Sequence, residues 1–328
     1  MINNPDGLLH IYVVNVGQGD TTIIVSPQGT VTVIDAQRPD KLERFLTAEL
    51  GLDGTIEHLI ITHPHADHFN GANRLASSFA VTRATFAPSW HEFGLGPPTY
   101  QGLVSALEAS GTIINFLSGY SRWYPDNLLV VPAGATSPVV DEDALYIELL
   151  GPTNALIRSL EGAQHFNTNH LSIMARVNWQ SARMIIAADA QMENWAFFRE
   201  EGLMEENCQV LRSAHHGSKN GTQWELIDRI DPAYVIISSD PDGRHHIPDL
   251  VGSGIFTDFN NPNNRRSVVM TSDSGTIHLQ STNGRRFTLE FGAEGVNDPV
   301  DLSQMTRLTH NSNPTNIFDL LNTRIAEI

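Results

Sequence analysis

One stretch, Ile60-Ile61-Thr62-His63-Pro64-His65-Ala66-Asp67-His68, limits what this chain can fold into more than any other feature. The apolar run that begins at His58 predicts a strand, and this strand ends directly before a dense group of imidazoles and a carboxylate. In an extended loop His63 and His65 point to the same side, whereas a turn at Ala66 redirects Asp67 and His68. We therefore expect two neighbouring metal ions at the end of a strand.

The rest of the chain alternates short apolar runs with amphipathic ones. We expect strands over 9–14, 21–25, 31–34, 58–61, 84–87, 113–117, 145–150, 172–178, 184–188, 210–213, 234–238, 267–271, 276–280 and 287–291. Helices are expected over 41–50, 73–79, 102–109, 193–201 and 223–230. Loops rich in proline and glycine, 89–98 and 134–143, are candidate lids. This alternation of strands and helices is typical of a fold with two sheets covered by helices.

Length and composition indicate one large globular domain, residues 1–292, followed by a polar tail, 293–328, with a short helix near 317–325. The tail is a candidate contact for a protein partner. A single cysteine, Cys208, excludes an internal disulfide and a thiolate-only metal site, which favours a reducing compartment. We see no signal peptide and no membrane-spanning run, so we expect a cytoplasmic protein that does not contact a membrane.

The net charge of −17 disfavours wrapping by long nucleic acid, because a basic surface is needed to neutralise phosphates. It still allows a narrow local groove. Basic residues in the C-terminal half that could build such a groove are Lys219, Arg244, Arg265, Arg266, Arg285 and Arg286.

The histidine-rich stretch resembles the HxHxDH signature of the metallo-β-lactamase fold. Several other stretches resemble its DNA-uptake branch, the ComEC-type competence proteins. Val14-Asn15-Val16-Gly17-Gln18-Gly19-Asp20 is similar to that branch's opening strand, and Val33-Ile34-Asp35 to its next strand. The resemblance implies an α/β fold, the four-layer αββα sandwich. It also implies that Asp35 supports the ligand loop.

Further matches lie downstream. Asn169-His170-Leu171-Ser172 resembles the branch's Asn-x-x-Ser strand entry. Ala187-Ala188-Asp189 resembles its Gly-Asp strand end, with Ala188 where the branch usually has glycine. Ser213-Ala214-His215-His216-Gly217-Ser218 resembles its HHGS segment, and Arg244-His245-His246-Ile247-Pro248 is an altered form of its Gly-His-Pro segment.

These matches imply a set of residue roles. Asp189 would bridge the metals, and His245, with His246 as the alternative, would complete the second metal's ligands. Asn169 and His170 compete for the third ligand position of the first metal. The implied metal ligands are therefore His63, His65, Asp67, His68, His170, Asp189 and His245. Donors without thiolate suit zinc or manganese.

For catalysis, Asp67 and Asp189 would orient the attacking water, and either His215 or His216 would protonate the leaving oxygen. The implied substrate-binding residues are Asn169, Ser172, Gly217, Ser218 and Lys219, with Gly217 and Ser218 presenting donors to a phosphate oxygen. The extra histidine pair favours phosphoester chemistry over β-lactam chemistry.

We therefore hypothesise a metal-dependent phosphodiesterase or nuclease whose partner is a phosphodiester, including single-stranded nucleic acid. Candidate stacking platforms for a strand are Trp90, Tyr100, Tyr120, Trp123 and Tyr124. One alternative is hydrolysis of a small molecule, such as a nucleotide, a phosphocholine ester or a lactone, at the same metals. A second is a catalytically silent binding protein that keeps the fold.

Overall fold

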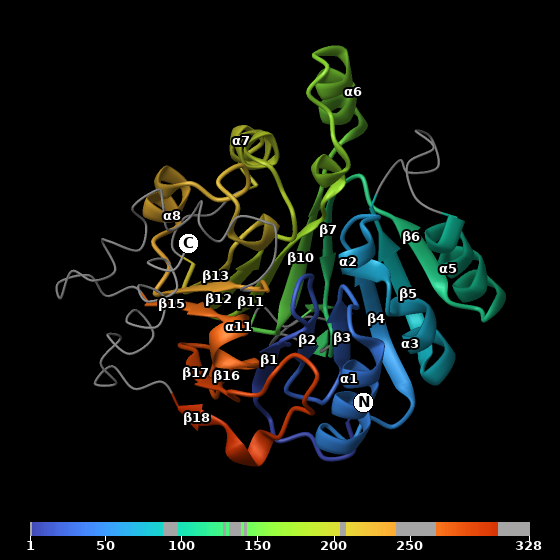
Figure 1. The fold of residues 1–328 in the computed structure, drawn as a ribbon, viewed down its shortest axis with the longest axis vertical. Helices are drawn as coiled ribbons and strands as arrows, with labels where there is room; N and C mark the ends of the chain where they lie inside the picture. Colours follow the sequence, from blue (N-terminus) through green and yellow to red (C-terminus); the bar gives the residue numbers. More distant parts are fainter. Residues whose placement is uncertain are drawn as a thin grey trace.

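The structure, a computed structural model, describes residues 2–87, 98–126, 129–130, 139–140, 143–203, 208–240 and 267–307. Within these residues two large sheets dominate (Figure 1). The first contains, in spatial order, β18 (Thr306–Arg307), β17 (Thr288–Phe291), β16 (Ile277–Ser281), β1 (Leu9–Val13), β2 (Thr22–Val25), β3 (Val31–Ile34), β4 (Thr55–Ile61), β5 (Ala80–Phe86) and β6 (Ile113–Phe116).

The second sheet contains, in spatial order, β15 (Ser267–Met270), β14 (Tyr234–Ile237), β13 (Val210–Arg212), β12 (Ala182–Ile186), β11 (Met174–Trp179), β10 (Tyr146–Gly151) and β7 (Gly119–Trp123). A separate pair joins β8 (Leu129–Val130) and β9 (Val139–Val140). The described helices are α1 (Pro39–Arg44), η1 (Phe45–Glu49), α2 (Ala66–Phe69), α3 (Ala72–Ser78), α5 (Pro98–Ala109), α6 (Asn154–Gly162), η2 (Thr168–Leu171), α7 (Met192–Glu200), η3 (His215–Gly217), α8 (Trp224–Ile230), α11 (Thr271–Ser274) and η4 (Leu302–Gln304).

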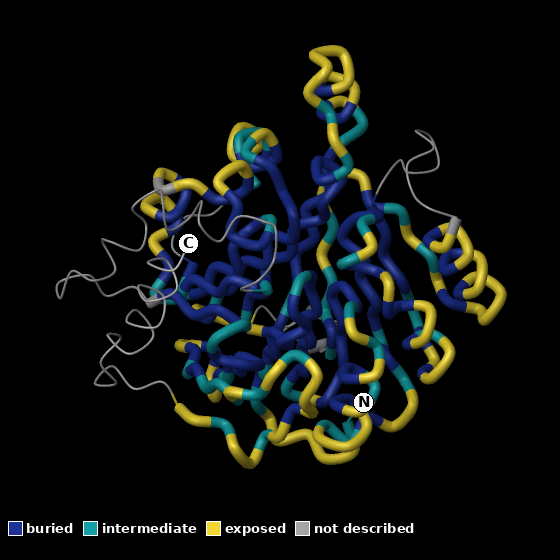
Figure 2. The backbone as a smooth tube through the Cα atoms, viewed as in Figure 1, coloured by how far each residue is buried: buried dark blue, intermediate teal, exposed yellow. Residues whose placement is uncertain are grey.

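The core is divided into three layers of apolar contacts, which confirms the expected four-layer αββα arrangement. One layer lies between the sheets and includes Ile60, Ile147 and Ile186. A second joins the outer face of the first sheet to the helices on that side, through residues such as Leu42. A third joins the second sheet to α7 and α8, through residues such as Phe198. Figure 2 shows the resulting pattern, with both sheets buried and the helices exposed on their outer sides.

The alternation of apolar residues predicted most of these strands, but among the described elements of five residues or more it missed β7 and α6. β7 carries Gly-Tyr-Ser-Arg-Trp, a polar edge strand whose pairing with β10 supplies the order that its composition does not. α6 is amphipathic, and its N-terminus is capped by the Thr153 side chain, which accepts a hydrogen bond from the backbone N–H of Leu156. The candidate lid 89–98 lies outside the described residues except for Pro98. Most of 134–143 lies outside them as well.

The described part of the predicted tail, residues 293–307, packs against the first sheet. Val300 belongs to the outer core layer, and β18 pairs with β17. Lys41 and Glu294 form a buried ion pair with a distance of 3.0 Å from Nζ to Oε1. The helix expected near 317–325 lies outside the described residues. None of the helices in the described part of the chain has the length and apolarity that a bilayer-spanning segment needs.

The strand directions bring distant parts of the sequence to one edge of the sandwich. β3 runs parallel to β4, and β12 runs parallel to β13 and β14. Residues that follow parallel strands meet at the carboxyl ends of those strands. Asp35, His63, Asp189 and His215 each follow one of these strands, so the topology collects them at one place.

Buried His58 provides a pH-dependence test of this core. Burial lowers its pKa to about 3, whereas the unfolded side chain titrates near about 6.5. Between these values only the unfolded state binds the proton, so stability rises with pH and is lost as pH falls below the unfolded value. In urea unfolding between pH 6.5 and 5, we expect His58→Gln to lose less stability than wild type, by up to about 1.4 kcal/mol per pH unit. Equal slopes would show that His58 is protonated in the fold.

Candidate metal centre

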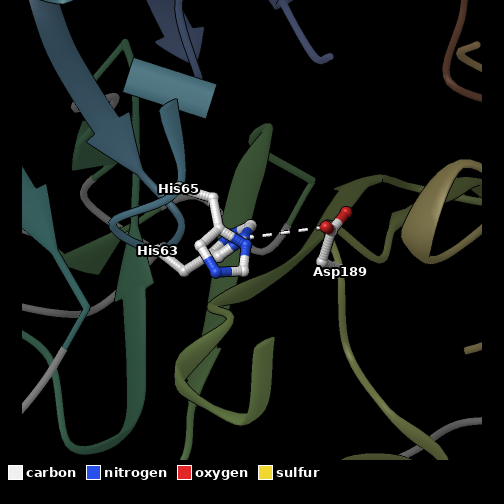
Figure 3. Close-up of side chains that lie close together, drawn as sticks. All are labelled: His63, His65 and Asp189. Atoms are coloured by element: carbon white, nitrogen blue, oxygen red, sulfur yellow. Dashed lines mark hydrogen bonds and ion pairs between the residues drawn. The ribbon is translucent and has the colours of Figure 1, made fainter. Parts of the chain in front are cut away.

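The first part of the site is formed by the loop that follows β4. The distance from His63 Nε2 to His65 Nδ1 is 3.0 Å, so the two imidazoles converge as the extended-loop argument predicts. His63 Nε2 also lies 3.6 Å from Asp189 Oδ2, as Figure 3 shows. These three side chains can offer one ligand atom each to a single ion.

Asp189 lies at the centre of the site and faces two groups of histidines. Its Oδ2 is directed to His63, while its Oδ1 is 3.3 Å from His68 Nε2 and 3.7 Å from His216 Nε2. The preceding residue, Ala188, has a φ of 50°, a left-handed conformation that favours glycine. The turn expected from the sequence is therefore kept, with alanine in a strained position.

A second set of donors combines Asp67, His68 and His216. Asp67 Oδ2 is 3.3 Å from His216 Nε2. Three atoms that converge here are buried and form no hydrogen bond with any described residue: His68 Nε2, His216 Nε2 and Asp189 Oδ1. Leaving such atoms without a partner is costly, and a divalent cation would satisfy all three.

The residues present therefore fit two divalent ions. His63, His65 and Asp189 would hold the first, and Asp67, His68, His216 and Asp189 would hold the second. Metal-binding imidazoles usually hydrogen-bond a carboxylate through their other nitrogen. His68 follows this pattern, because its Nδ1 lies 2.7 Å from Asp35 Oδ2. Asp35 also accepts hydrogen bonds of 2.8 Å from the backbone N–H and the hydroxyl of Thr62, so it supports the loop as expected.

Burial and charge set the protonation of these groups in opposite directions. Burial lowers the pKa of His63 well below its usual value. Burial also opposes the charged form of His68, but Asp189 and Asp35 raise the pKa of His68 well above its usual value. Burial alone would raise the pKa of Asp67, yet the nearby imidazole of His216 and the charge of His68 lower it. Its carboxylate is thus held ionised, as a metal ligand must be.

His215 differs from its neighbour His216. Both have a φ of 51°, and their rings are tilted by 57° to one another with centroids 6.2 Å apart. The His215 side chain is 20% exposed, and its Nε2 lies 3.8 Å from Asp189 Oδ2. Its Nδ1 is 2.9 Å from Asn220 Oδ1, which orients the ring. Among the described residues His215 joins none of the candidate ligand groups, so it lies beside the ions' positions rather than between them.

Two residues that sequence reasoning missed lie behind the second group. Asp20 forms a buried ion pair with Arg212, and its Oδ2 lies 3.6 Å from His68 Nδ1. The Asp20 backbone N–H donates to the carbonyl of Asp67 at 3.1 Å, where a side chain on Gly19 would collide with that carbonyl. The Val-Gly-Gln-Gly-Asp sequence was a usable signal for Asp20. Arg212, an arginine that ends an apolar strand, offered none.

Removing one partner of the buried Arg212–Asp20 pair should strongly destabilise the fold. Arg212→Met leaves the Asp20 carboxylate without its cation, which costs about 3–5 kcal/mol for a buried pair. We expect urea unfolding of the chelator-treated protein to show this loss, and Arg212→Met combined with Asp20→Asn to recover much of it. Arg229→Met, at an exposed position, is the control and should change stability by less than about 0.5 kcal/mol. A loss as small as the control's would mean that the pair is not needed.

Some predicted site residues are placed differently. His170 Nε2 lies 3.3 Å from Glu193 Oε2, and its Nδ1 accepts from the backbone N–H of Asn167, so the imidazole is turned away from the centre. Asn169, the competing candidate, does face the centre, with its Nδ2 3.3 Å from His215 Nε2. The capping of η2 by Asn167 fixes this choice.

In the histidine turn, residues 215–218, the hydrogen-bond donors expected to face a phosphate are also used differently. The backbone N–H groups of Gly217 and Ser218 donate to the carbonyls of Ala214 and His215, at 3.1 and 2.8 Å. These two backbone donors close the turn and are not free to bind a phosphate oxygen, and the Ser218 hydroxyl stays a predicted donor. Ser172 is fully buried, whereas Lys219 is exposed. His245 and His246 lie outside the described residues.

Comparison with known proteins agrees with this geometry. The family model described as "Metallo-beta-lactamase superfamily" matches residues 14–239. ComE operon protein 3 of Bacillus subtilis (strain 168) is 23% identical over 317 residues, 89% of this chain and 35% of that protein. The chain thus spans about a third of the length of this curated relative.

Solved structures of low identity also resemble it. The diiron β-hydroxylase CmlA from Streptomyces venezuelae is 14% identical, with 81% of this chain and 53% of that chain covered and a TM-score of 0.48. An isothiocyanate hydrolase from Delia radicum gut bacteria is 12% identical, with 81% and 97% covered and a TM-score of 0.45. The family model covers more than half of the sequence and contains the ligand loop, Asp189 and the histidine turn. The chain therefore belongs to the metallo-β-lactamase superfamily, whose members are mostly metal-dependent hydrolases.

Proposed function

We propose that this protein is a metal-dependent phosphodiesterase. The observation that carries the proposal is His215, a partly exposed imidazole beside a buried set of metal donors. When bound, two divalent ions lower the pKa of water towards neutrality and stabilise the charge that builds up on a phosphoryl group. Zinc and manganese both suit the donors.

The protein's own residues orient the attacking water and transfer the proton. Asp67 and Asp189, held ionised by the surrounding imidazoles, accept hydrogen bonds and so orient the attacking water. Asn220 Oδ1 accepts from His215 Nδ1, and His215 Nε2, the nitrogen nearer Asp189, is the one that would carry the transferred proton. From this position it can protonate the leaving oxygen of a phosphodiester. His216 is buried among the ligands, which supports assigning the proton transfer to His215 alone.

Two of the candidate stacking platforms for a nucleic-acid strand are already covered by packing contacts, which supports a small or terminal phosphodiester. Tyr100 is fully buried and packs edge-on against Phe69 with a centroid distance of 5.0 Å, so it cannot stack on a base. The Trp123 ring is covered by the Arg83 guanidinium at 4.1 Å. Trp123 also lies four residues along β7 from Gly119, about 13 Å from the metal edge. Trp90 lies outside the described residues.

The substrate class is tested with a panel of phosphodiesters. We would load the protein with zinc or manganese and assay bis(p-nitrophenyl) phosphate, single-stranded DNA, duplex DNA and RNA. We expect hydrolysis of the small diester, and weaker or no cleavage of duplex DNA. Turnover of a lactone with no phosphodiester cleavage would overturn the proposal. A protein that bound no divalent metal and hydrolysed nothing would favour a silent binding role.

A further inference from the structure

A hollow lies at the amino-terminal end of β1, which is the opposite end of that strand from the metal centre. It has a volume of about 430 Å³ and is lined by the start of the chain, η1, β16 and β17. Asp6, Glu49 and Glu290 contribute carboxylates to its lining, and the described lining contains no lysine or arginine. The volume is in the range of small-molecule sites in proteins.

Three nearly parallel rings line one side of this hollow. Tyr12 stacks on His278 with a centroid distance of 4.5 Å, and His10 meets His278 edge to edge, with 2.9 Å between His10 Nδ1 and His278 Nε2. The rings lie together because His278 is directly opposite Tyr12 in the β1–β16 pairing. The Tyr12 ring adds an aromatic surface to the acidic hollow, and cations are attracted to such rings.

The Tyr12 hydroxyl is the observation that indicates a ligand. Tyr12 is only 3% exposed and lines the hollow, yet its hydroxyl forms no hydrogen bond with any described residue. Burial, followed by the negative charges of Asp6 and Glu290, raises the pKa of this hydroxyl, so it stays protonated near both carboxylates. Because this oxygen has no hydrogen-bond partner among the described residues and is not fully enclosed, it can accept a hydrogen bond from a ligand in the hollow.

A metal ion fits this hollow poorly, because the imidazole nitrogens are already engaged. His10 Nε2 lies 3.0 Å from Asp6 Oδ2, and His10 Nδ1 lies 2.9 Å from His278 Nε2. His278 Nδ1 lies 3.1 Å from Glu290 Oε2. Within the described part of the chain, these side chains do not form a three-ligand group. Carboxylate oxygens remain as acceptors, which matches a ligand that only donates hydrogen bonds.

We propose that this hollow binds a protonated organic amine with a flat apolar body. The ammonium group would donate to Asp6, Glu290 and the Tyr12 hydroxyl oxygen, and the body would lie against the stacked rings. Val25 and Leu50 in the lining supply apolar contact for that body. The site is separate from the metal centre, so the proposal does not depend on the phosphodiesterase assignment.

The test uses calorimetric titration of the full chain with phenethylamine and with 2-phenylethanol, a neutral molecule of nearly the same shape. We expect the amine to bind at least tenfold more tightly than the alcohol. Glu290→Gln and Asp6→Asn should each weaken amine binding about tenfold, and Tyr12→Phe, which removes only the hydroxyl, several-fold. Glu161→Gln, at an exposed position on α6, is the charge-matched control and should leave binding unchanged.

Three outcomes would overturn the proposal. The first is equal binding of amine and alcohol. The second is amine binding that survives all three pocket substitutions. The third is weakening by Glu161→Gln as large as that by Glu290→Gln, which would show general charge attraction. Circular dichroism of each variant separates lost binding from lost folding, and Tyr12→Phe keeps the stacked ring in any case.

Discussion

Replacing Asp189 with alanine should abolish hydrolysis and remove bound metal. This carboxylate faces both donor groups, so its loss takes one ligand from each ion and removes the negative charge that lies near four imidazoles. Divalent ions contribute several kcal/mol to stabilising charge in the transition state, which corresponds to about a thousandfold or more in rate. Metal content measured by mass spectrometry and diester hydrolysis should fall together.

The matched control is Asp53→Asn, which removes a carboxylate from an exposed turn. It should retain both metal and rate. His65→Ala should have a smaller effect on metal content than Asp189→Ala, because it removes a ligand from the first group only. Unchanged activity in both Asp189→Ala and His65→Ala would disprove the metal mechanism.

Replacing His215 should lower the rate of hydrolysis, whereas replacing His216 should lower the amount of bound metal. His215→Ala should keep its metal and lose about a hundredfold or more in rate, the usual cost of removing a general acid. His216→Ala should lose metal from the second group, because its Nε2 lies among Asp67 and Asp189. The two effects are separated by measuring metal content alongside the pH dependence of the rate.

A pH profile gives His215 a signature of its own. If His215 donates the proton, the alkaline limb of the wild-type rate profile should disappear in His215→Ala. The rate loss of His215→Ala should appear with an alkyl phosphodiester, and bis(p-nitrophenyl) phosphate, whose leaving group needs no protonation, should restore much of the rate. The control is His165→Ala, which removes an exposed histidine. Loss of metal from His215→Ala would make His215 a ligand and defeat the assignment.

Much of the fold was readable because strands with one or both faces buried leave an apolar pattern. The runs at 9–14, 31–34 and 234–238 match β1, β3 and β14 to within one residue at either end. β7 was not readable, because a polar edge strand is ordered by its partner and not by its own composition. The packing of residues 293–307 likewise depends on a strand partner, β17, and on the Lys41–Glu294 pair.

The sequence by itself determined the ligand loop and the family of chemistry. Closely spaced imidazoles after an apolar strand are a local feature, and the loop's extended backbone already sends His63 and His65 to one side. The supporting role of Asp35 was also expected and is observed. The ligand loop could be predicted because it depends on neighbours in the chain, whereas the role of Asp35, which contacts residues far along the chain, was expected from the family resemblance.

Only the tertiary structure decided which distant residues meet and which side chains turn away. The Arg212–Asp20 pair joins segments far apart in the sequence, whereas the positive φ of His215 and His216 and the capping of η2 are features of the local backbone. Parallel strands carry Asp35, His63, Asp189 and His215 to one edge, but the direction in which each side chain points there is set by local backbone conformation and packing. A sequence motif indicates which residues can bind a metal, and the tertiary structure decides which of them lie close enough together to do so.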